Sequence, residues 1–232
     1  MKTWITKSGY KITRIVSGRS NAFLLTDGEK NILIDTSVSR MWSRLRKRIE
    51  QSGVNRIDYL ILTHAHFDHA GSAANIREVY KAKVIVHEAE AQHLSAGKHN
   101  LPVGTTVISK FLVNVIGKRF LSGFKSEPCL PDIPVDATFD LSNIGFNAYL
   151  MHTPGHTAGS VSLIVDDEIA IVGDTLFGVF GWTVFPPFAE DEKLMITSWG
   201  KLLETKCSEF LPAHGSANSR SLVQKDYNKR KQ

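Results

Sequence analysis

The sequence predicts an α/β protein, a four-layer αββα sandwich in which two mixed β-sheets pack face to face with helices outside. Apolar runs of strand length alternate with segments of helical period in the first half of the chain, and such alternation is typical of layered α/β architecture. Strand-rich segments resume in the second half and are again followed by helical segments. With 232 residues the chain can bury a sizeable core. We therefore expect one domain over residues 1–232.

The first half of the chain carries the clearest alternation. Residues 21–37 predict two strands around a turn at Asp27-Gly28, and residues 38–53 have a helical period that stops at a glycine. Residues 57–64 form a short, mostly apolar run, as expected of a strand buried on both faces. This half is completed by a helix over 71–80, a strand over 82–87 and a helix over 88–97.

The pattern loosens between residues 98 and 134, a segment with four prolines and several aromatic residues. We expect an insertion here, near the active site, rather than a separate domain. The second half then predicts strands over 146–153, 160–167 and 168–175, a helix over 193–206, a strand over 208–215 and a helical tail. The Asp-Asp-Glu stretch between the second and third of these strands suits a hairpin turn.

Composition argues against several classes of protein. No apolar run approaches the roughly 18 residues that a membrane helix needs, and the first residues lack the features of a signal peptide, so we expect a cytoplasmic protein without membrane partners. The two cysteines, Cys129 and Cys207, cannot supply a disulfide framework. The formal charge of +5 comes mainly from residues 43–50 and 225–232, which are interpreted as solvated helical surfaces, so nucleic acid is not an expected partner.

Candidate metal ligands lie directly after apolar strands. Three histidines and an aspartate occur within six positions, spaced His-x-His-x-Asp-His, and three later strands also end near a histidine or aspartate. Loops on a rigid scaffold commonly present chemistry in this way. In chain order, these residues are His64, His66, Asp68, His69, His156, Asp174 and His214.

The spacing favours two metals rather than one. His64 and His66 are two positions apart, so on an extended chain they point to one side and can share an ion. Asp68 and His69 are adjacent where the chain turns into the next helix, and they can address a neighbouring point. Imidazole and carboxylate suit Zn²⁺, and also iron or manganese. We expect two divalent metal ions, zinc first, with the small residues 70–74 giving the helix room beside them.

Four segments, "THAHFDHAG", "TPGHTAGS", "GDTLF" and "PAHG", resemble the motif series of the metallo-β-lactamase superfamily. The resemblance covers nearly the whole chain and implies the metallo-β-lactamase fold. It also implies a ligand set: His64, His66 and His156 for one metal, Asp68, His69 and His214 for the other, and Asp174 bridging both. Asp35 matches the family's early "IDT" aspartate, which usually supports the metal ligands from behind.

Such a pair of metals implies hydrolysis. Two cations about 3.5–4 Å apart share a water and lower its pKa toward neutrality, which gives a metal-bound hydroxide that attacks a carbonyl or phosphorus centre. Asp68 is the expected catalytic side chain, because it can orient the proton of this hydroxide. No serine or cysteine nucleophile is needed, and Cys207 is expected to serve packing.

The expected substrate class follows from positions at which this sequence differs from other members of the family it resembles. Aspartate at position 174 resembles glyoxalase II, lactonases and related hydrolases, whereas true β-lactamases usually carry Cys or Ser there and most are exported. Glyoxalase II-like proteins continue "GDTLF" with Gly-Arg-x-Asp, but Trp182 and Val184 stand where Arg and Asp would fall. The chain ends 18 residues after His214, too early for the helical domain that binds glutathione in larger glyoxalase II enzymes. We therefore expect a substrate other than a glutathione thioester.

Aromatic residues crowd the loop after Asp174. The functional interpretation is an apolar wall beside the metals, favouring a small-molecule ester, lactone or thioester with an apolar part. The alternatives are ordinary core packing and, for Phe188 and its neighbours, a homodimer surface. The residues expected to line the substrate are Phe177, Phe180, Trp182, Phe185 and, from an earlier strand, His87.

Other functions on the same fold stay open. A phosphodiesterase or nuclease would use the same ions and explain the basic tail, but the chain has no basic, Gly-rich arm to clamp RNA. A β-lactam-hydrolysing enzyme is a further alternative. An iron protein that handles oxygen or sulfur would need an electron-transfer partner, and a non-catalytic binding module would have no use for all seven ligands.

Overall fold

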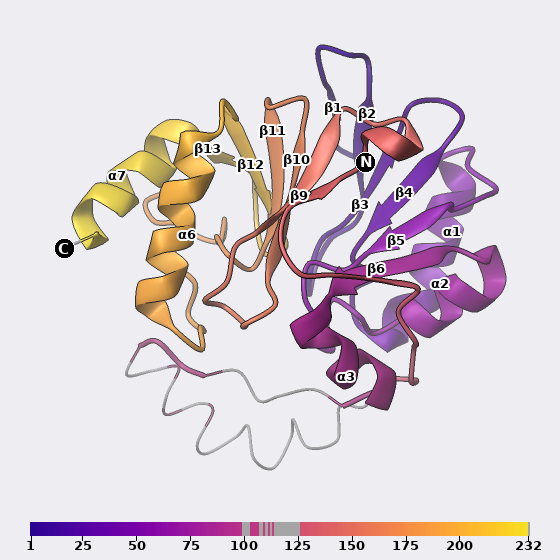
Figure 1. Cartoon of the computed structure of the whole chain (residues 1–232), viewed down its shortest axis with the longest axis horizontal. Coiled ribbons are helices and arrows are strands. Elements are labelled where there is room, and N and C mark those ends of the chain that lie inside the picture. The colour runs from indigo at the N-terminus through magenta and orange to yellow at the C-terminus, as the bar shows by residue number, and fades with distance from the viewer. Residues whose placement is uncertain (99–102, 107–108, 110, 112, 114–125, 232) are drawn as a thin grey trace.

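Two β-sheets face each other at the centre of the molecule (Figure 1). The computed structural model describes residues 1–98, 103–106, 109, 111, 113 and 126–231. Within them the first sheet has the order β1-β2-β3-β4-β5-β6-β7 and the second the order β13-β12-β11-β10-β9-β8. The first sheet consists of β1 Thr3–Ile5, β2 Lys11–Val16, β3 Ala22–Thr26, β4 Asn31–Ile34, β5 Tyr59–Ile61, β6 Lys83–His87 and β7 Ile133–Val135. The second consists of β8 Phe139–Asp140, β9 Ala148–His152, β10 Val161–Val165, β11 Ile169–Gly173, β12 Glu209–Pro212 and β13 Asn218–Ser219.

Both sheets are mixed, as the sequence predicts. In the first sheet, β1 to β4 pair antiparallel and β4 to β7 pair parallel. In the second, β11 and β12 pair parallel, while the other neighbours pair antiparallel. The parallel strands bring their carboxyl ends to one edge of each sheet, and the loops that leave these ends can meet there.

Helices cover the outer faces of both sheets, which confirms the αββα sandwich. Figure 1 shows α1, α2 and α3 beside the first sheet, with α6 and α7 beside the second. In the described part of the chain, no helix has the length and apolar character needed to cross a bilayer. The helices are α1 Trp42–Gln51, α2 Ala73–Tyr80, α3 Glu88–Ala96, α6 Glu192–Glu204 and α7 Arg220–Arg230, with short 3-10 turns at Ser39–Met41 and Ser142–Ile144.

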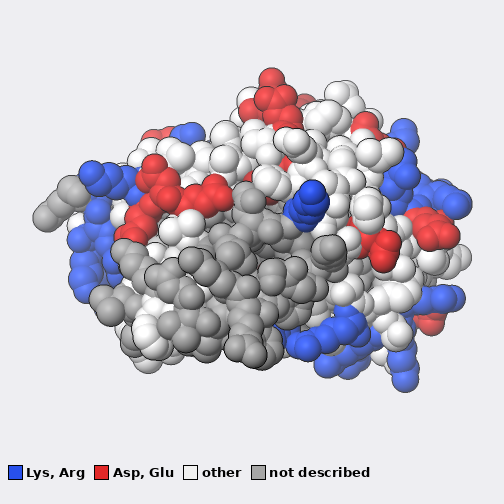
Figure 2. Space-filling model, turned by 90° about the horizontal axis from the view of Figure 1, so that it is seen from below, with Lys and Arg blue, Asp and Glu red and all other residues white. Residues whose placement is uncertain are grey.

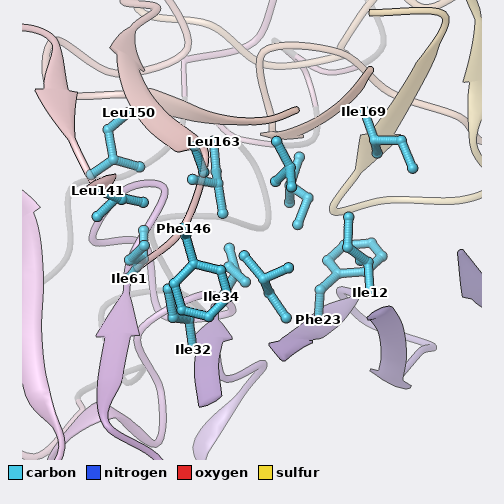
Figure 3. Close-up of a cluster of buried hydrophobic side chains, with 14 of the residues drawn as sticks. Ile12, Phe23, Ile32, Ile34, Ile61, Leu141, Phe146, Leu150, Leu163 and Ile169 are labelled. Atoms are coloured by element: carbon cyan, nitrogen blue, oxygen red, sulfur yellow. The ribbon is translucent and has the colours of Figure 1, made fainter. Parts of the chain in front are cut away.

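The main core lies between the two sheets and follows the two-residue period of the strands (Figure 3). Ile32 and Ile34 of β4 point into it, and they meet Leu163 of β10 and the ring of Phe146. All four side chains are at most 1% exposed. Burial of each such side chain is worth about 1.5–3 kcal/mol, so this layer is a main source of stability.

The alternate strand residues build the two outer layers. Leu33 of β4 faces α1 and α2 in one cluster, whereas Ile164 of β10 packs with Trp199 of α6 and Val223 of α7 in another. Trp199 is fully buried, and its Nε1 donates to the Thr175 carbonyl at 2.7 Å. This bond ties α6 to the loop that follows Asp174.

The predicted elements are present, with corrections at their ends. The strand expected over 57–64 is shorter, because after Ile61 the chain leaves the ladder, and Thr63 accepts from Val161 of the opposite sheet at 2.9 Å. Cys207 lies after α6, and burial raises the pKa of its thiol to about 11, which agrees with the expected packing role. The strands not predicted are β1, β2, β7, β8 and β13.

The insertion expected over 98–134 lies largely outside the described residues. Its described beginning runs along residues 186–189: Gly104 forms a bridge with Phe188, and the Thr105 amide donates to the Pro187 carbonyl at 3.0 Å. Its expected end needs correction, because Ile133 and Pro134 already belong to β7 of the first sheet.

The predicted hairpin turn between β10 and β11 links the two sheets at the end of these strands farther from Asp174. Asp166, with a φ of 56°, accepts hydrogen bonds from the Ser8 amide at 3.0 Å, the Ser8 hydroxyl at 2.7 Å and Asn147 Nδ2 at 2.9 Å. Burial opposes ionisation, but these hydrogen bonds lower the pKa of Asp166 below its ordinary value.

We expect Asp166→Asn to lower the free energy of unfolding at pH 7 by about 1–3 kcal/mol, because it removes hydrogen bonds to a charged acceptor. Because the pKa of Asp166 is lower in the folded than in the unfolded protein, its carboxylate stabilises the folded state at pH values above the unfolded-state pKa of about 3.9. This stabilisation is lost as the pH falls through the folded-state pKa. The gap between wild type and variant should therefore narrow below about pH 4. Urea unfolding at several pH values measures it; a gap that stays constant with pH would contradict the assignment.

Candidate metal centre

The seven predicted ligands meet where loops leave the ends of strands from both sheets. His64, His66, Asp68 and His69 lie on the loop between β5 and α2. The other three come from the second sheet: His156 from the loop after β9, Asp174 from the residue after β11, and His214 from the turn after β12. The sandwich thus brings together groups that are up to 150 positions apart in the sequence, 64 to 214.

The first group is formed by three buried imidazoles, His64, His66 and His156. His66 Nδ1 is 3.0 Å from His64 Nε2 and 3.1 Å from His156 Nε2, so three ring nitrogens converge on one point. The orientation of His156 is fixed from behind, since its Nδ1 is 3.0 Å from the Phe188 carbonyl. A carbonyl only accepts, so Nδ1 carries the proton and Nε2 is left as a lone-pair donor.

The second group contains Asp68, His69 and His214. Asp68 Oδ2 is 3.5 Å from His214 Nε2, and Asp68 Oδ1 is 3.9 Å from His69 Nε2. The ring of His69 is fully buried, whereas Asp68 and His214 are partly exposed. This group therefore has an open side.

Asp174 lies between the two groups. Its carboxylate oxygens are 3.3 Å from His214 Nε2, 3.4 Å from His69 Nε2 and 3.5 Å from His156 Nε2. His64, His69 and Asp174 also form a third set of potential ligands that crosses the two groups. One carboxylate with neighbours in both groups has the position needed to contact two ions.

Asp35 supports His69 from behind. Its Oδ2 is 2.8 Å from His69 Nδ1 and accepts from the Thr63 hydroxyl at 2.8 Å, while Oδ1 accepts from the Thr63 amide at 2.9 Å. The proton of His69 is thereby held on Nδ1, and Nε2 faces Asp174. Carboxylates placed behind a histidine in this way orient metal ligands and fix their tautomer.

Burial and neighbouring charge divide the histidines into two kinds. Burial, together with the imidazoles of His69 and His66, lowers the pKa of His64 well below its ordinary value. His64 is therefore a neutral imidazole, the form that binds a metal. Burial acts the same way on His69, but the carboxylates of Asp174 and Asp35 outweigh it and raise the pKa of His69 well above its ordinary value.

The same balance applies around Asp174. Burial opposes its ionisation, but the imidazoles of His214 and His69 hold the pKa of Asp174 well below its ordinary value. Burial also opposes charge on His214, and Asp174 outweighs it and raises the pKa of His214. The carboxylate thus stays charged at neutral pH, as a metal ligand must.

Two buried atoms at the centre test whether metal ions fit. His69 Nε2 and Asp174 Oδ1 are 3.4 Å apart, and neither makes a hydrogen bond with any described residue. Buried polar atoms without partners are costly, and a cation coordinated by both would satisfy them. Imidazole and carboxylate donors suit divalent zinc, iron or manganese. The residues present therefore fit a dinuclear metal site.

Glycine is required beside Asp174. Gly173 has a φ of +52°, and a Cβ there would come within 2.6 Å of Thr63 Oγ1. Thr63 is the residue that Asp35 holds, so the absence of a side chain at Gly173 lets β11 approach the His64 loop closely. This approach places Asp174 against the histidines.

A cavity of about 320 Å³ opens beside the cluster. Phe177, Phe67 and Phe188 provide aromatic walls, and Arg19 is the only Lys or Arg among its described lining residues. Phe177 was expected to line the substrate, and its ring stacks near His214 with centroids 4.6 Å apart. Phe67 and Arg19 are not among the predicted residues, and for Phe188 the sequence leaves open an apolar wall beside the metals or a dimer surface.

The other residues expected to line the substrate lie elsewhere. Phe180 and Trp182 are 51% and 68% exposed and pack on each other, because the loop turns outward after Gly178. Phe185 packs against Trp199 and under Arg230, on the helical side of the second sheet. His87 caps α3 by accepting from the Ala89 amide, and its Nε2 faces the Asp136 carbonyl. None of these four side chains is among the described lining residues of the cavity, whose aromatic lining consists of Phe67, Phe177 and Phe188.

Glu90 is a further site residue that sequence reasoning missed. This buried carboxylate of α3 accepts from the Ala65 amide at 3.0 Å and from the Gly159 amide at 3.1 Å. Ala65 lies between His64 and His66, and Gly159 lies three residues after His156, so one side chain joins both loops of the first group. In the sequence, the only signal of this role is that Glu90 stands between two alanines of the predicted helix.

We expect Glu90→Gln to weaken metal binding at the first group, because one amide N–H would then face an NH₂ group instead of an oxygen. A lost charge-assisted hydrogen bond costs about 1–3 kcal/mol, corresponding to roughly a tenfold to hundredfold weaker affinity if it acts on the loops. Competition with a chromophoric chelator measures the affinity. Glu88→Gln, on the exposed side of the same helix, is the matched control. If Glu90→Gln bound metal as tightly as Glu88→Gln, Glu90 would have no role in holding the ligand loops.

The fold and the site define an αββα sandwich whose His- and Asp-rich clusters fit a dinuclear metal centre. The sequence profile of the Metallo-beta-lactamase superfamily matches residues 16–214. The chain therefore belongs to the metallo-β-lactamase superfamily, as the four motifs indicated.

Individual relatives agree with this assignment. The chain is 32% identical over 209 residues to "Probable metallo-hydrolase MJ0888" of Methanocaldococcus jannaschii, covering 87% of this chain and 90% of that protein. It is 29% identical over 214 residues to "Hydroxyacylglutathione hydrolase GloC" of Haemophilus influenzae, covering 89% and 90%. Among solved structures, "TTHA1623 in a di-iron-bound form" is 25% identical with a TM-score of 0.65, covering 91% of this chain and 96% of that one.

The family and the ligand clusters together identify a metal-dependent hydrolase. The expectation of an enzyme is confirmed, and the described residues contain the expected His- and Asp-rich clusters that could hold metal ions.

Proposed function

We propose that this protein hydrolyses the carbonyl group of an ester, lactone or thioester whose acyl or leaving group is partly apolar. The observation that carries the proposal is the cavity that Asp68, Asp174 and His214 line together with the rings of Phe67 and Phe177. Polar groups that converge in an apolar pocket are the usual form of a small-molecule site.

His64, His66 and His156 would hold one cation, Asp68, His69 and His214 the other, and Asp174 would contact both. Bound there, two divalent cations supply Lewis acidity and lower the pKa of a water that both can reach. Asp68, on the open side of the second group, accepts a hydrogen bond from the attacking water and orients it toward the substrate carbonyl. Asp35 and the Phe188 carbonyl keep the ring protons of His69 and His156 away from the metals.

Zinc is the cation that we propose first, because neutral imidazoles and carboxylates form its common sites. Iron is the alternative, since the donor set serves it equally well and the related TTHA1623 was solved in a di-iron-bound form. Metal analysis of protein purified without added metal distinguishes the two.

Thioesters rank first among the carbonyl substrates. The relative from Haemophilus influenzae carries the name of a hydroxyacylglutathione hydrolase, and this chain spans 90% of its length. The length of the chain is therefore no argument against a glutathione thioester as substrate.

A phosphodiesterase is the second candidate, and the distribution of charge argues against it. On the face that Figure 2 shows, most of the described Lys and Arg residues lie toward the end near α7 and toward the end that holds α1 and α2, and acidic side chains lie beside both groups. Phosphate backbones are bound by continuous basic surfaces, whereas the described lining of the cavity contains one such residue, Arg19.

A panel of esters, lactones, thioesters, phosphodiesters and a cephalosporin, offered to protein reconstituted with zinc or iron, tests the proposal. We expect turnover of carbonyl substrates, loss of turnover with a chelator and recovery on adding metal back. Cleavage of phosphodiesters or of the cephalosporin alone would overturn the proposal in favour of that alternative.

A further inference from the structure

Arg19 lies at the rim of the cavity beside the metal cluster, in the connection between β2 and β3. Its side chain is exposed, and within the described residues its guanidinium has no hydrogen bond or ion pair. The other described lining residues are histidines, the aspartates of the cluster and three phenylalanines. Arg19 is thus the one fixed positive charge that this lining offers to a bound molecule.

The backbone next to Arg19 is held against both sides of the second ligand group. The Ser20 hydroxyl donates to the Asp68 carbonyl. Asn21 Nδ2 donates to the Pro212 carbonyl at 2.9 Å and to the Gly215 carbonyl at 3.0 Å, which flank His214. Ser20 and Asn21 are both buried. The position of Arg19 is therefore fixed relative to Asp68 and His214, although its side chain reaches into open space.

The carboxylates of the cavity do not neutralise Arg19. Asp174 has three imidazole neighbours within 3.5 Å, and Asp68 is paired with His214. With metals bound, both carboxylates would serve as ligands, and Arg19 would keep its charge without a partner among the described residues. Guanidinium groups bind carboxylates and phosphates through paired N–H donors.

We propose that Arg19 binds an anionic group of the substrate, a carboxylate or a phosphate, at a distance from the carbonyl that reacts. The inference rests on the proposed hydrolysis of carbonyl compounds and narrows its substrate class to anionic molecules with an apolar middle part, which the rings of Phe67, Phe177 and Phe188 would contact. Because this contact is the same before and during the reaction, it lowers KM and leaves kcat nearly unchanged.

Two matched pairs of thioesters test the proposal. S-Hexanoyl-3-mercaptopropionate and its methyl ester differ in a carboxylate, while S-hexanoyl-4′-phosphopantetheine and S-hexanoylpantetheine differ in a phosphate. Thiol release gives KM and kcat for wild type, Arg19→Ala and Arg19→Lys. Arg44→Ala, on the exposed surface of α1, is the control for removing a positive charge elsewhere.

In wild type we expect a lower KM for the anionic member of at least one pair, and the pair that responds identifies the anion. Arg19→Ala should raise that KM about tenfold to a hundredfold, as for a lost hydrogen bond to a charged group, with Arg19→Lys in between and the neutral members and Arg44→Ala unchanged. Equal KM values for charged and neutral members, unaffected by Arg19→Ala, would overturn the inference and leave the proposed function standing. If wild type hydrolyses no member of either pair, the proposed thioester activity and the inference fall together.

Discussion

Replacing Asp174 by asparagine is expected to lower kcat/KM by roughly a thousandfold, because metal ions contribute several kcal/mol to transition-state stabilisation and each 1.36 kcal/mol is a factor of about ten. The carboxylate of Asp174 lies within 3.5 Å of imidazoles from both ligand groups, His156 of the first and His69 and His214 of the second. Asparagine keeps the size but loses the charge and one acceptor oxygen, so the two ions lose their shared ligand. Turnover and metal content, measured on the same preparation, check this result.

The fold should survive this substitution. Asp174 follows β11 and contacts the ligand histidines rather than the hydrophobic core, so the packing of the strand does not depend on its charge. Thermal unfolding of the metal-free proteins should show little change. Asp140→Asn, an exposed carboxylate on β8, is the control that should keep both metals and activity. Full turnover of Asp174→Asn with two bound metals would refute the dinuclear mechanism.

The ligand cluster could be predicted from the sequence because its ligands follow the ends of apolar strands. His64 and His66 follow the run that forms β5, and Asp174 and His214 end the runs that form β11 and β12. Strand ends are marked locally by the switch from apolar to polar residues. A layered α/β fold brings such ends to one edge, so local information was enough to predict which residues meet.

The residues that line the cavity beside the ligands could not be predicted in this way. The aromatic run after Asp174 predicts an apolar segment but not the direction of each ring. Phe177 faces the cavity, whereas Phe185 faces α6, because the chain turns between them. Arg19 and Glu90 reach the site through contacts with segments distant in the sequence. Such contacts leave no periodic signal.

Short edge strands were missed for a related reason. β8 and β13 have two residues each and lie at the edges of the second sheet. A two-residue strand has too few side chains to show an alternation. β2, with six residues, was missed as well, whereas the five-residue strands β3, β6, β9, β10 and β11 were predicted to within a few residues.

Asp35→Asn is expected to weaken binding of the second metal by about ten- to a hundredfold, the usual effect of losing a carboxylate that orients a metal-binding histidine. Asp35 has a φ of +58°, which asparagine tolerates. Its two oxygens meet three groups, the Thr63 amide, the Thr63 hydroxyl and His69 Nδ1. Asparagine offers one oxygen and an NH₂ group, so it cannot accept from all of them, and His69 is no longer held with its proton on Nδ1.

Stepwise chelator competition should separate the two metals, with the affinity of the second group reduced and that of the His64 group nearly kept. Asp58→Asn is the matched control, because Asp58 also accepts from a backbone amide, that of Asn31 at 2.9 Å, but precedes β5 at the end away from the ligands. Its metal affinities should equal those of wild type. Unchanged affinity at both groups in a folded Asp35→Asn protein would mean that the ligand loops alone hold His69 in place. If the affinity of the second group falls as expected, the buried carboxylate of Asp35 is what sets the tautomer of His69.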